Sequence, residues 1–180
     1  MYTYIILLRG INVSGQKKMK MDVLRTLLEN LGFQNVATYI QSGNIVLQAK
    51  DASIRNLEDI IGEGIREHFG FDVPILVKSK TDLERIVKEN PFKDAITLEG
   101  NRLYFVLLKS VPEQVLVESL AQETFENQEF RITDSCVYLW CKNGYGKAKL
   151  DNNFLERKLK VQATTRNYRT MLKLLEMAKG

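Results

Sequence analysis

The sequence contains no long hydrophobic stretch, only two cysteines and a single histidine. Its apolar runs extend over a handful of residues, far fewer than the ~18 that a membrane-crossing helix requires. The first residues also lack the basic, apolar and small-residue segments of a secretory signal, and a strand-like run follows Met1 almost directly. We therefore expect a cytoplasmic protein without a membrane-spanning segment.

The two cysteines, Cys136 and Cys141, fall in one strand-like run. Five residues of extended strand separate them by roughly 16 Å, whereas a disulfide needs Cα atoms within about 7 Å. We expect two buried, reduced thiols instead of a crosslink. With His68 as the single histidine, the cysteines offer no zinc-ligand spacing, and we expect no metal and no cofactor.

Little in the sequence indicates catalysis. No nucleophile and base occur together in a recognisable pattern, and His68 lies at the edge of an apolar helix face. Gly10 and Gly15 have the spacing of a phosphate-binding P-loop, but Gln16 stands where that loop requires lysine. Whether the protein is an enzyme stays open on this evidence.

A chain of 180 residues can fold as one domain or two small ones, and 44% hydrophobic and 27% charged residues are typical of a globular protein. Its net charge is +4, but basic and acidic residues are concentrated in different segments of the chain. Residues 142–173 hold nine Lys or Arg against two acidic residues, residues 9–25 hold five against one, and the segment between them is acidic. If the basic segments share a face, that face attracts anions over about 8 Å; otherwise they are separate solvated surfaces.

Hydrophobic periodicity and turn residues predict a β-α-β-β-α-β order in the first half of the chain. The predicted elements are a strand at 2–8, a helix at 21–31, hairpin strands at 36–40 and 44–48, a helix at 53–69 and a strand at 73–77. This order is that of ferredoxin-like folds. The run Thr81-Asp82-Leu83-Glu84 then has the spacing of a capping box, which predicts a helix that ends at Asn90-Pro91.

The second half repeats most of this order. Its predicted elements are a strand at 103–108, a helix at 113–124, hairpin strands at 130–133 and 136–141, and helices at 151–159 and 167–177. The last element is therefore a helix where the first half has a strand. We predict an α+β protein of two tandem ferredoxin-like halves, 1–90 and 101–180, with a linker at 90–100 and an extra helix ending the second half.

Three segments are distinctive: YIILLRGINVSGQKKMKMDVLRTLLENLGF, TYIQSGNIVL and GYGKAKLDNNFLERKLKVQATTRNYRTMLKLLEM. They resemble a bacterial family catalogued as domain of unknown function 1697, and Asn90-Pro91-Phe92 also resembles it. The resemblance implies two ferredoxin-like halves and implies no activity. Ser14 stands where the family has glycine, and Lys160-Val161-Gln162 where it has Gly-Val-Pro, which makes the turn before the last helix less rigid.

Three short loops beside strand-like runs, at 9–15, 41–44 and 143–147, contain glycines that permit close backbone approach to an anion. The C-terminal block is the best candidate, because basic residues and threonines precede two predicted helix N-termini, near Asp151 and Asn167. We predict that a phosphate-bearing or other anionic small ligand binds at a basic site built from both chain ends. The candidate residues are Arg9, Asn12, Lys147, Lys149, Arg166 and Asn167.

Two other functions stay open. The protein can be an enzyme acting on a small phosphorylated or acidic metabolite, or a protein-interaction module with no small ligand. Nucleic acid is a less favoured partner, because the strand-like run at 44–47 lacks the aromatics of an RNA-recognition motif and the acidic middle segment would repel a polyanion. Tyr138 and Trp140 share one strand face, where we expect them to pack in the core.

Overall fold

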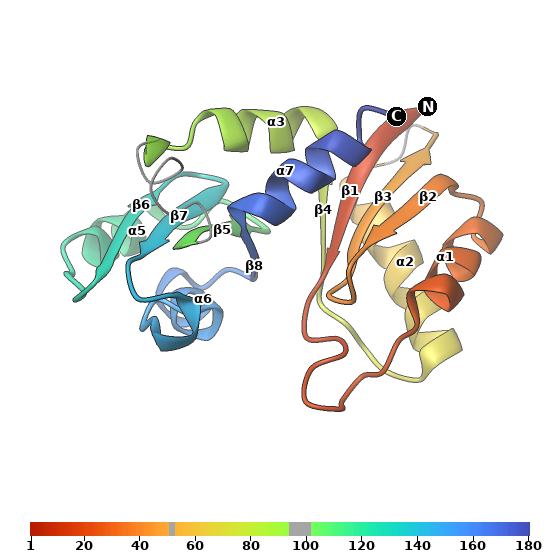
Figure 1. Cartoon of the computed structure of the whole chain (residues 1–180), viewed down its shortest axis with the longest axis horizontal. Helices are drawn as coiled ribbons and strands as arrows, with labels where there is room; N and C mark the ends of the chain where they lie inside the picture. Colours follow the sequence, from red (N-terminus) through yellow and green to blue (C-terminus); the bar gives the residue numbers. More distant parts are fainter. Residues whose placement is uncertain (51–52, 94–101) are drawn as a thin grey trace. The chain divides into compact units, whose positions relative to one another are not determined.

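The computed structural model describes residues 1–50, 53–93 and 102–180. They form two compact units, and each unit is described by itself: Met1–Glu84 with Lys173–Gly180, and Arg85–Leu172. Each unit contains one four-stranded antiparallel sheet, and six α-helices occur among the described residues (Figure 1). The α+β class is therefore confirmed, and the two sheets are consistent with two similar halves. The predicted linker at 90–100 lies largely in residues 94–101, outside the described residues.

The first unit contains the elements β1 (Tyr2–Leu8), α1 (Met21–Asn30), β2 (Gln34–Tyr39), β3 (Asn44–Ala49), α2 (Ile54–Phe69) and β4 (Ile75–Ser79). Its strands lie side by side in the order β2-β3-β1-β4, and every neighbouring pair is antiparallel. The predicted strands and helices are confirmed with shifts of one or two residues at their ends. Alternation of buried side chains places both helices on one face of the sheet, against a core that includes Ile6, Leu24 and Ile61.

The turn between β2 and β3 lies against the end of β1. Leu7 pairs with Asn44, and the backbone N–H of Leu8 donates to the Gly43 carbonyl at 2.8 Å. Gly43 has a φ of +77°, and a Cβ at this position would lie 2.5 Å from the Leu8 Cβ. Only glycine therefore fits this turn without moving β1.

Local capping explains where α2 begins and ends and where the next helix begins. The Ser53 hydroxyl accepts from the Asn56 N–H at the start of α2, and Gly70 ends the helix in the left-handed conformation. Helix α3 (Lys80–Lys88) begins one residue before the predicted capping box. The Ser79 hydroxyl accepts from the Asp82 N–H and donates to the Asp82 carboxylate, so Ser79 caps this helix where we predicted Thr81.

The second unit contains β5 (Leu103–Leu108), α5 (Gln114–Ala121), β6 (Gln128–Ile132), β7 (Cys136–Cys141), a 3-10 turn η2 (Tyr145–Lys147), α6 (Asn152–Leu159) and β8 (Ala163–Asn167). Its sheet order, β6-β7-β5-β8, corresponds to that of the first unit. Strand β8 corrects the predicted β-α-β-β-α order, because Thr164, Thr165 and Arg166 pair with β5 as an edge strand. The extra helix α7 (Tyr168–Met177) then follows, as predicted.

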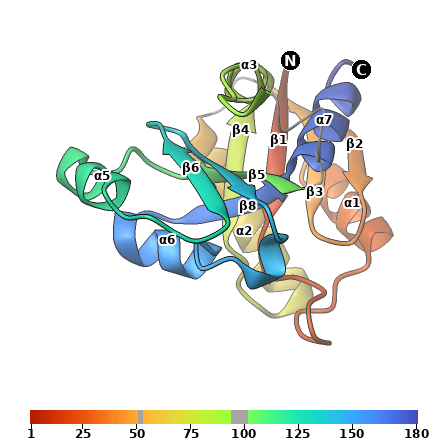
Figure 2. The same ribbon diagram turned by 60° about the vertical axis from the view of Figure 1, so that its left-hand side comes forward.

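Helices α5 and α6 cover one face of the second sheet, where Val106, Leu139 and Leu155 are among the core residues (Figure 2). On the other face Tyr138 is buried, and its hydroxyl donates to the Ile86 carbonyl at 2.7 Å. Cys136 and Cys141 lie buried at the two ends of β7 and form no disulfide, as their spacing predicts.

Candidate anion-binding site

A cavity of about 190 Å³ lies in the second unit, beside the point where β6 begins and β7 ends. The lining residues come from two loops that precede β6 and follow β7: Glu126, Asn127, Gln128, Asn143, Gly144, Lys147, Ala148 and Lys149. The third predicted loop, at 143–147, thus lines a cavity together with two of the predicted site residues, Lys147 and Lys149.

Backbone hydrogen bonds hold the two loops together at this cavity. The N–H of Lys142 donates to the Asn127 carbonyl at 2.9 Å, and the N–H of Leu150 donates to the Gln128 side-chain oxygen at 3.0 Å. Gly144 has φ 83° and ψ 158°, a conformation that is essentially restricted to glycine. The turn that carries Lys147 therefore has a defined backbone, and Gly144 is required for it.

Tyr145 fastens this turn to the rest of the unit. Its hydroxyl accepts from the Asn152 N–H at 3.0 Å and donates to the Thr165 hydroxyl at 3.3 Å, and its ring packs 4.8 Å from the Tyr104 ring. Burial raises the pKa of Tyr145 above its ordinary value. Tyr145 thus stays protonated at neutral pH and acts as an anchor, so it does not supply a base beside Lys147.

The charge at the cavity comes from three exposed side chains: Lys147, Lys149 and Glu126. Across the described ranges 1–50, 53–93 and 102–180, neither lysine has a hydrogen-bond or ion-pair partner. Two unpaired ammonium groups on one small cavity attract an anion, while Glu126 limits the excess positive charge to a single unit.

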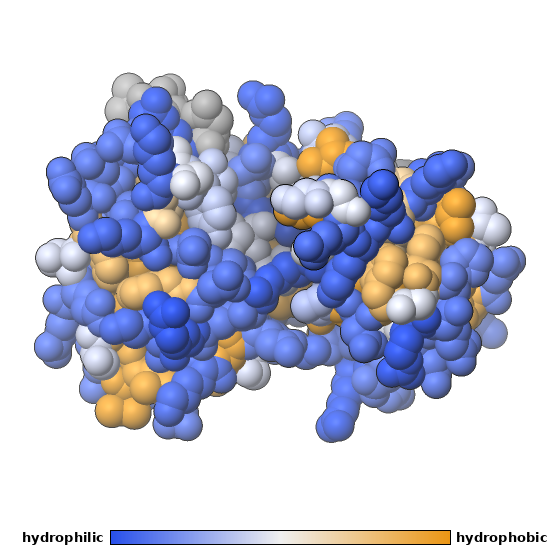
Figure 3. Space-filling model, turned by 90° about the horizontal axis from the view of Figure 1, so that it is seen from below, coloured by the Kyte–Doolittle hydropathy of each residue, from blue (hydrophilic) through white to orange (hydrophobic). Residues whose placement is uncertain are grey.

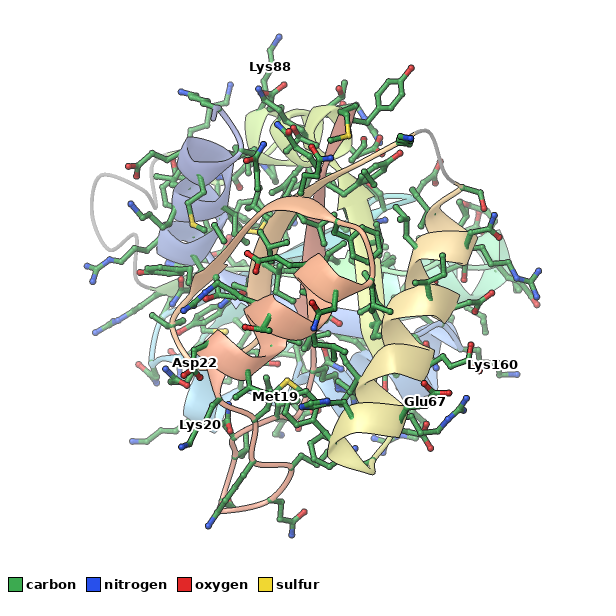
Figure 4. The ribbon with its side chains drawn as sticks, turned by 90° about the vertical axis from the view of Figure 1, so that its right-hand side faces the viewer. Met19, Lys20, Asp22, Glu67, Lys88 and Lys160 are labelled. Carbon is green, nitrogen blue, oxygen red and sulfur yellow. The ribbon has the colours of Figure 1, made fainter. Side chains whose placement is uncertain are left out.

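Asn12 occupies a structural position in the first unit. Its side-chain N–H₂ group donates to the carbonyls of Met19 and Gln41, both at 2.9 Å, and its side-chain oxygen accepts from the Met19 N–H at 2.8 Å. These bonds close the loop between β1 and α1 and join it to the β2–β3 turn. Figure 4 shows the end of this loop, where Met19 is buried and Lys20 lies exposed at the start of α1.

Arg9 begins the same loop and is half-buried, and its backbone N–H donates to the Pro74 carbonyl at 3.1 Å. The loop that follows has left-handed backbone at Gly10, Asn12, Ser14, Gly15 and Lys17. Lys17 also donates from its ammonium group to the Asp72 carbonyl at 2.6 Å. The two candidate residues of the N-terminal end therefore belong to a loop whose conformation is fixed by hydrogen bonds within the first unit.

Arg166 and Asn167 are the last two residues of β8 and directly precede α7, so the predicted helix N-terminus near Asn167 is confirmed, while the residues before it form a strand. Arg166 is partly buried, and burial lowers its pKa to about 10, so its guanidinium still carries a positive charge at neutral pH. The Asn167 side-chain oxygen accepts from the Thr170 N–H at 2.8 Å and so caps α7.

The predicted helix N-terminus near Asp151 is confirmed, and a side chain of the protein caps it. The Asp151 carboxylate accepts from the Phe154 N–H at 2.8 Å in the first turn of α6. A carboxylate at this position already satisfies the helix dipole. The neighbouring cavity is therefore a better candidate for the predicted anion site than the end of α6.

Sequence reasoning missed the part of the cavity that comes from before β6. Asn127 and Gln128 lie next to Lys147 only because β6 and β7 pair with Gln128 opposite Cys141. Asn127 has a left-handed φ of 59°, and a predicted hairpin extended by two residues would have indicated its place beside the glycine turn. The hydrogen bond that the Leu150 N–H donates to the Gln128 side-chain oxygen could not be predicted from any sequence pattern.

No helix among the described residues is long and apolar enough to cross a membrane. In the same residues no group of three or more His, Cys, Asp or Glu side chains could hold a metal ion. On the face seen in Figure 3, hydrophobic residues form separate patches among hydrophilic ones.

The family model described as "Protein of unknown function (DUF1697)" matches residues 1–138. The chain belongs to this family. The match ends before the cavity lysines, so the C-terminal segment that also resembles the family lies beyond the matched residues. The sequence has no match among curated proteins.

A solved structure with the same fold is that of the conserved bacterial protein SP0830 from Streptococcus pneumoniae. The two chains superpose with a TM-score of 0.74, at 22% sequence identity and with 98% of each chain covered. At this identity the likeness shows the fold alone.

Proposed function

We propose that this DUF1697 protein binds a phosphate-bearing or other anionic small ligand, and that Lys147 and Lys149 hold its anionic group. The observation that carries the proposal is the pairing of two partnerless ammonium groups on one cavity with a fixed backbone. Structural lysines in surface ion pairs have a carboxylate within reach, as Lys158 has in Glu123 at 2.5 Å. Unlike Lys158, Lys147 and Lys149 have no carboxylate within ion-pair distance among the described residues.

The size of the cavity supports a particular class of ligand. Its volume of about 190 Å³ is below the ~300–1,000 Å³ that encloses a drug-sized molecule. A phosphate or carboxylate group fits such a cavity while the remainder of its ligand extends into solvent. The two lysines supply point charges with rotatable donors, which suits a phosphate whose orientation is set by its other contacts.

A site built from both chain ends stays a prediction. Asn12 and Asn167 already use their side-chain oxygens within the fold, so we assign them a supporting role. Arg9 in the first unit and Arg166 in the second retain their place as candidate cations. The variants Arg9→Ala and Arg166→Ala test whether either residue contributes to the affinity of the cavity.

The experiment is a titration with inorganic phosphate followed by a panel of nucleotides and sugar phosphates, read by calorimetry and by thermal unfolding. A ligand at about 100 times its dissociation constant stabilises the folded state by roughly 2.7 kcal/mol. For a chain of this size the melting temperature then rises by about 5–10 °C. We expect Lys147→Ala and Lys149→Ala each to remove most of this shift.

The matched control is Lys88→Ala, which removes an equally exposed lysine from α3, outside the cavity. Equal, small shifts in the wild type and all three variants would refute the proposal. A second titration uses short oligonucleotides at several salt concentrations. The logarithm of the affinity for a polynucleotide falls by roughly 0.7–0.9 per log unit of salt for each phosphate that the protein neutralises. If the logarithm of the affinity falls with the logarithm of the salt concentration at a slope steeper than about −3, the ligand is a nucleic acid and the proposal of a small ligand is wrong.

We infer further that both units are ferredoxin-like halves of a duplicated chain. The support is that each has the order β-α-β-β-α-β and that both sheets have the same strand order. A cytoplasmic location is also part of the proposal, supported by two buried cysteines that form no disulfide, as is usual in a reducing compartment. Fractionation of cells that produce the protein tests the location.

A further inference from the structure

Strand β6 is an edge strand of the second sheet and has no bulge. Of the strands in the described residues it pairs with β7 alone, and its register with β7 runs unbroken from Gln128 to Ile132. At its first residue, Gln128, it also forms an isolated bridge to Phe125 of the preceding turn. The edge strand β2 of the first sheet is different, because its register shifts between Gln34 and Ala37 and Asn35 has a left-handed φ of 51°. Bulges of this kind protect an edge from pairing with another chain, and β6 lacks one.

The hydrogen-bond pattern of β6 shows which of its backbone groups face outward. The N–H of Thr133 donates to the Cys136 carbonyl and the N–H of Lys142 donates to the Asn127 carbonyl. In an antiparallel ladder the hydrogen-bonded pairs alternate, so 131 and 129 also bond to β7. Residues 128, 130 and 132 therefore direct their N–H and C=O groups away from the sheet. The N–H of Gln128 donates to the Phe125 carbonyl at 3.4 Å within its own turn, so the outward donors of the edge are those of Phe130 and Ile132.

A cavity of about 560 Å³ lies along this edge, between β6 and α5. Its apolar lining includes Val117, Phe125, Phe130 and Ile132. This volume gives room for side chains of a strand added to β6. The edge and the cavity together form one surface, which we call the β6 edge.

We propose that the β6 edge joins two copies of this chain as an antiparallel dimer centred on Phe130. The charges on β6 select both the partner and the register. When Phe130 lies opposite Phe130 of the second copy, the N–H and C=O groups of the two Phe130 residues meet, and the Gln128 carbonyl of each copy faces the Ile132 N–H of the other. The same register places Glu129 of each copy opposite Arg131 of the other.

Other registers that match the outward groups are less favourable. A dimer centred on Glu129 places two carboxylates opposite each other, and one centred on Arg131 places two guanidinium groups opposite each other. Directly opposite like charges destabilise a sheet, whereas opposite charges stabilise it. The sequence Gln-Glu-Phe-Arg-Ile is thus self-complementary in one register.

The present contacts of these side chains permit the pairing. One carboxylate oxygen of Glu129 forms an ion pair with the Lys142 ammonium nitrogen at 3.0 Å. The other oxygen can then pair with Arg131 of the second copy. Arg131 donates to the Phe130 carbonyl at 2.8 Å. In the dimer that carbonyl accepts from the Phe130 N–H of the second copy, and the Arg131 guanidinium moves to Glu129.

The first test is the molar mass in solution, measured by light scattering over a range of protein concentrations. One chain has a mass of 20.7 kDa, and we expect twice this mass at high concentration. Each single charge reversal, Glu129→Arg or Arg131→Glu, creates two like-charge pairs, and we expect the dimer to weaken about tenfold. The double variant Glu129→Arg/Arg131→Glu restores opposite charges, and we expect its dimer to approach wild-type affinity.

The second test is oxidative crosslinking of single cysteine variants. Phe130→Cys places two thiols on the two-fold axis at about 5.5 Å between Cα atoms, within the range of a disulfide. The matched control is Ile132→Cys, whose two copies would be about 13 Å apart along the strands. Wild-type protein reports any reaction of the buried Cys136 and Cys141.

We expect a crosslinked dimer for Phe130→Cys and none for Ile132→Cys. A single-chain mass up to about 1 mM protein would overturn the proposal, since specific association is stronger than that. Equal crosslinking of both cysteine variants, or a double charge variant that stays as weak as the single ones, would overturn the register. Because the charge variants leave the apolar residues unchanged, they remain decisive if Phe130→Cys fails to fold.

Discussion

Replacing Gly43 with alanine tests the turn that joins β2 and β3 to the end of β1. Gly43 combines a left-handed φ of +77° with a close approach, because an added Cβ would lie 2.5 Å from the Leu8 Cβ and 3.1 Å from the Ile11 Cδ1. The methyl group cannot swing away, because it is attached to the backbone and meets a Cβ that is attached to another backbone. We therefore expect the alanine to force β1 and the turn apart.

The expected loss has two parts. Left-handed backbone costs an L-residue other than glycine roughly 1–2 kcal/mol. Overpacking a filled interior costs about 1–3 kcal/mol more. The free energy of unfolding should therefore fall by about 2–5 kcal/mol, a large fraction of the ~5–15 kcal/mol that stabilises a typical domain.

The matched control is Gly10→Ala in the loop after β1. Gly10 has nearly the same φ, +73°, but an added Cβ there meets no atom within 4 Å. Gly10→Ala should thus show only the backbone part of the loss, about 1–2 kcal/mol. Urea unfolding followed by circular dichroism measures both variants against the wild type. Equal losses in the two variants would refute the reasoning, because the close approach to Leu8 would then cost nothing.

Two further predictions concern stability. Asn12→Ala removes three hydrogen bonds that close the loop before α1, so the free energy of unfolding should fall by about 1–3 kcal/mol in urea unfolding; an unchanged midpoint would show that water replaces the amide. Burial raises the pKa of Cys141 from 9.0 to about 11, so the folded protein keeps a proton that the unfolded chain loses. The contribution of the Cys141 thiol to the free energy of unfolding is complete below pH 9 and is lost as the pH rises through 11. The free energy of unfolding should therefore decline over that pH range, and it should decline less in Cys141→Ala. Equal pH dependence in the two proteins would contradict the prediction.

Most of the order of elements could be predicted from the sequence, because short-range patterns encode it. The apolar face of α2, its serine cap and Gly70 set that helix without reference to the rest of the chain. Strand β8 could not be predicted in this way, since Ala163–Asn167 lacks an apolar alternation and is extended because it pairs with β5. The cap at Ser79 was missed for a smaller reason, as two overlapping Ser/Thr-x-x-Asp/Glu patterns differ by two residues.

The candidate site shows the same division. The sequence indicated Lys147 and Lys149, because lysines next to a glycine turn are visible without a structure. It also indicated Asn12 and Asn167, but the type of residue does not show whether an amide binds a ligand, closes a loop or caps a helix. Those roles depend on which backbone groups lie within hydrogen-bond distance.

By itself, the sequence determined the α+β class, the repeated order of elements, the reduced thiols and the basic character of both chain ends. Composition, periodicity and spacing act over a few residues, and these properties need no more. The tertiary structure decided that Asn127 and Gln128 share a cavity with the two lysines, that Gly43 must lie against Leu8, and that β6 has an open, unbulged edge. The place of Gly43 and the edge position of β6 depend on strand pairing between segments far apart in the chain. The cavity depends on the exact register of the β6–β7 hairpin, and local sequence patterns do not specify such pairing uniquely.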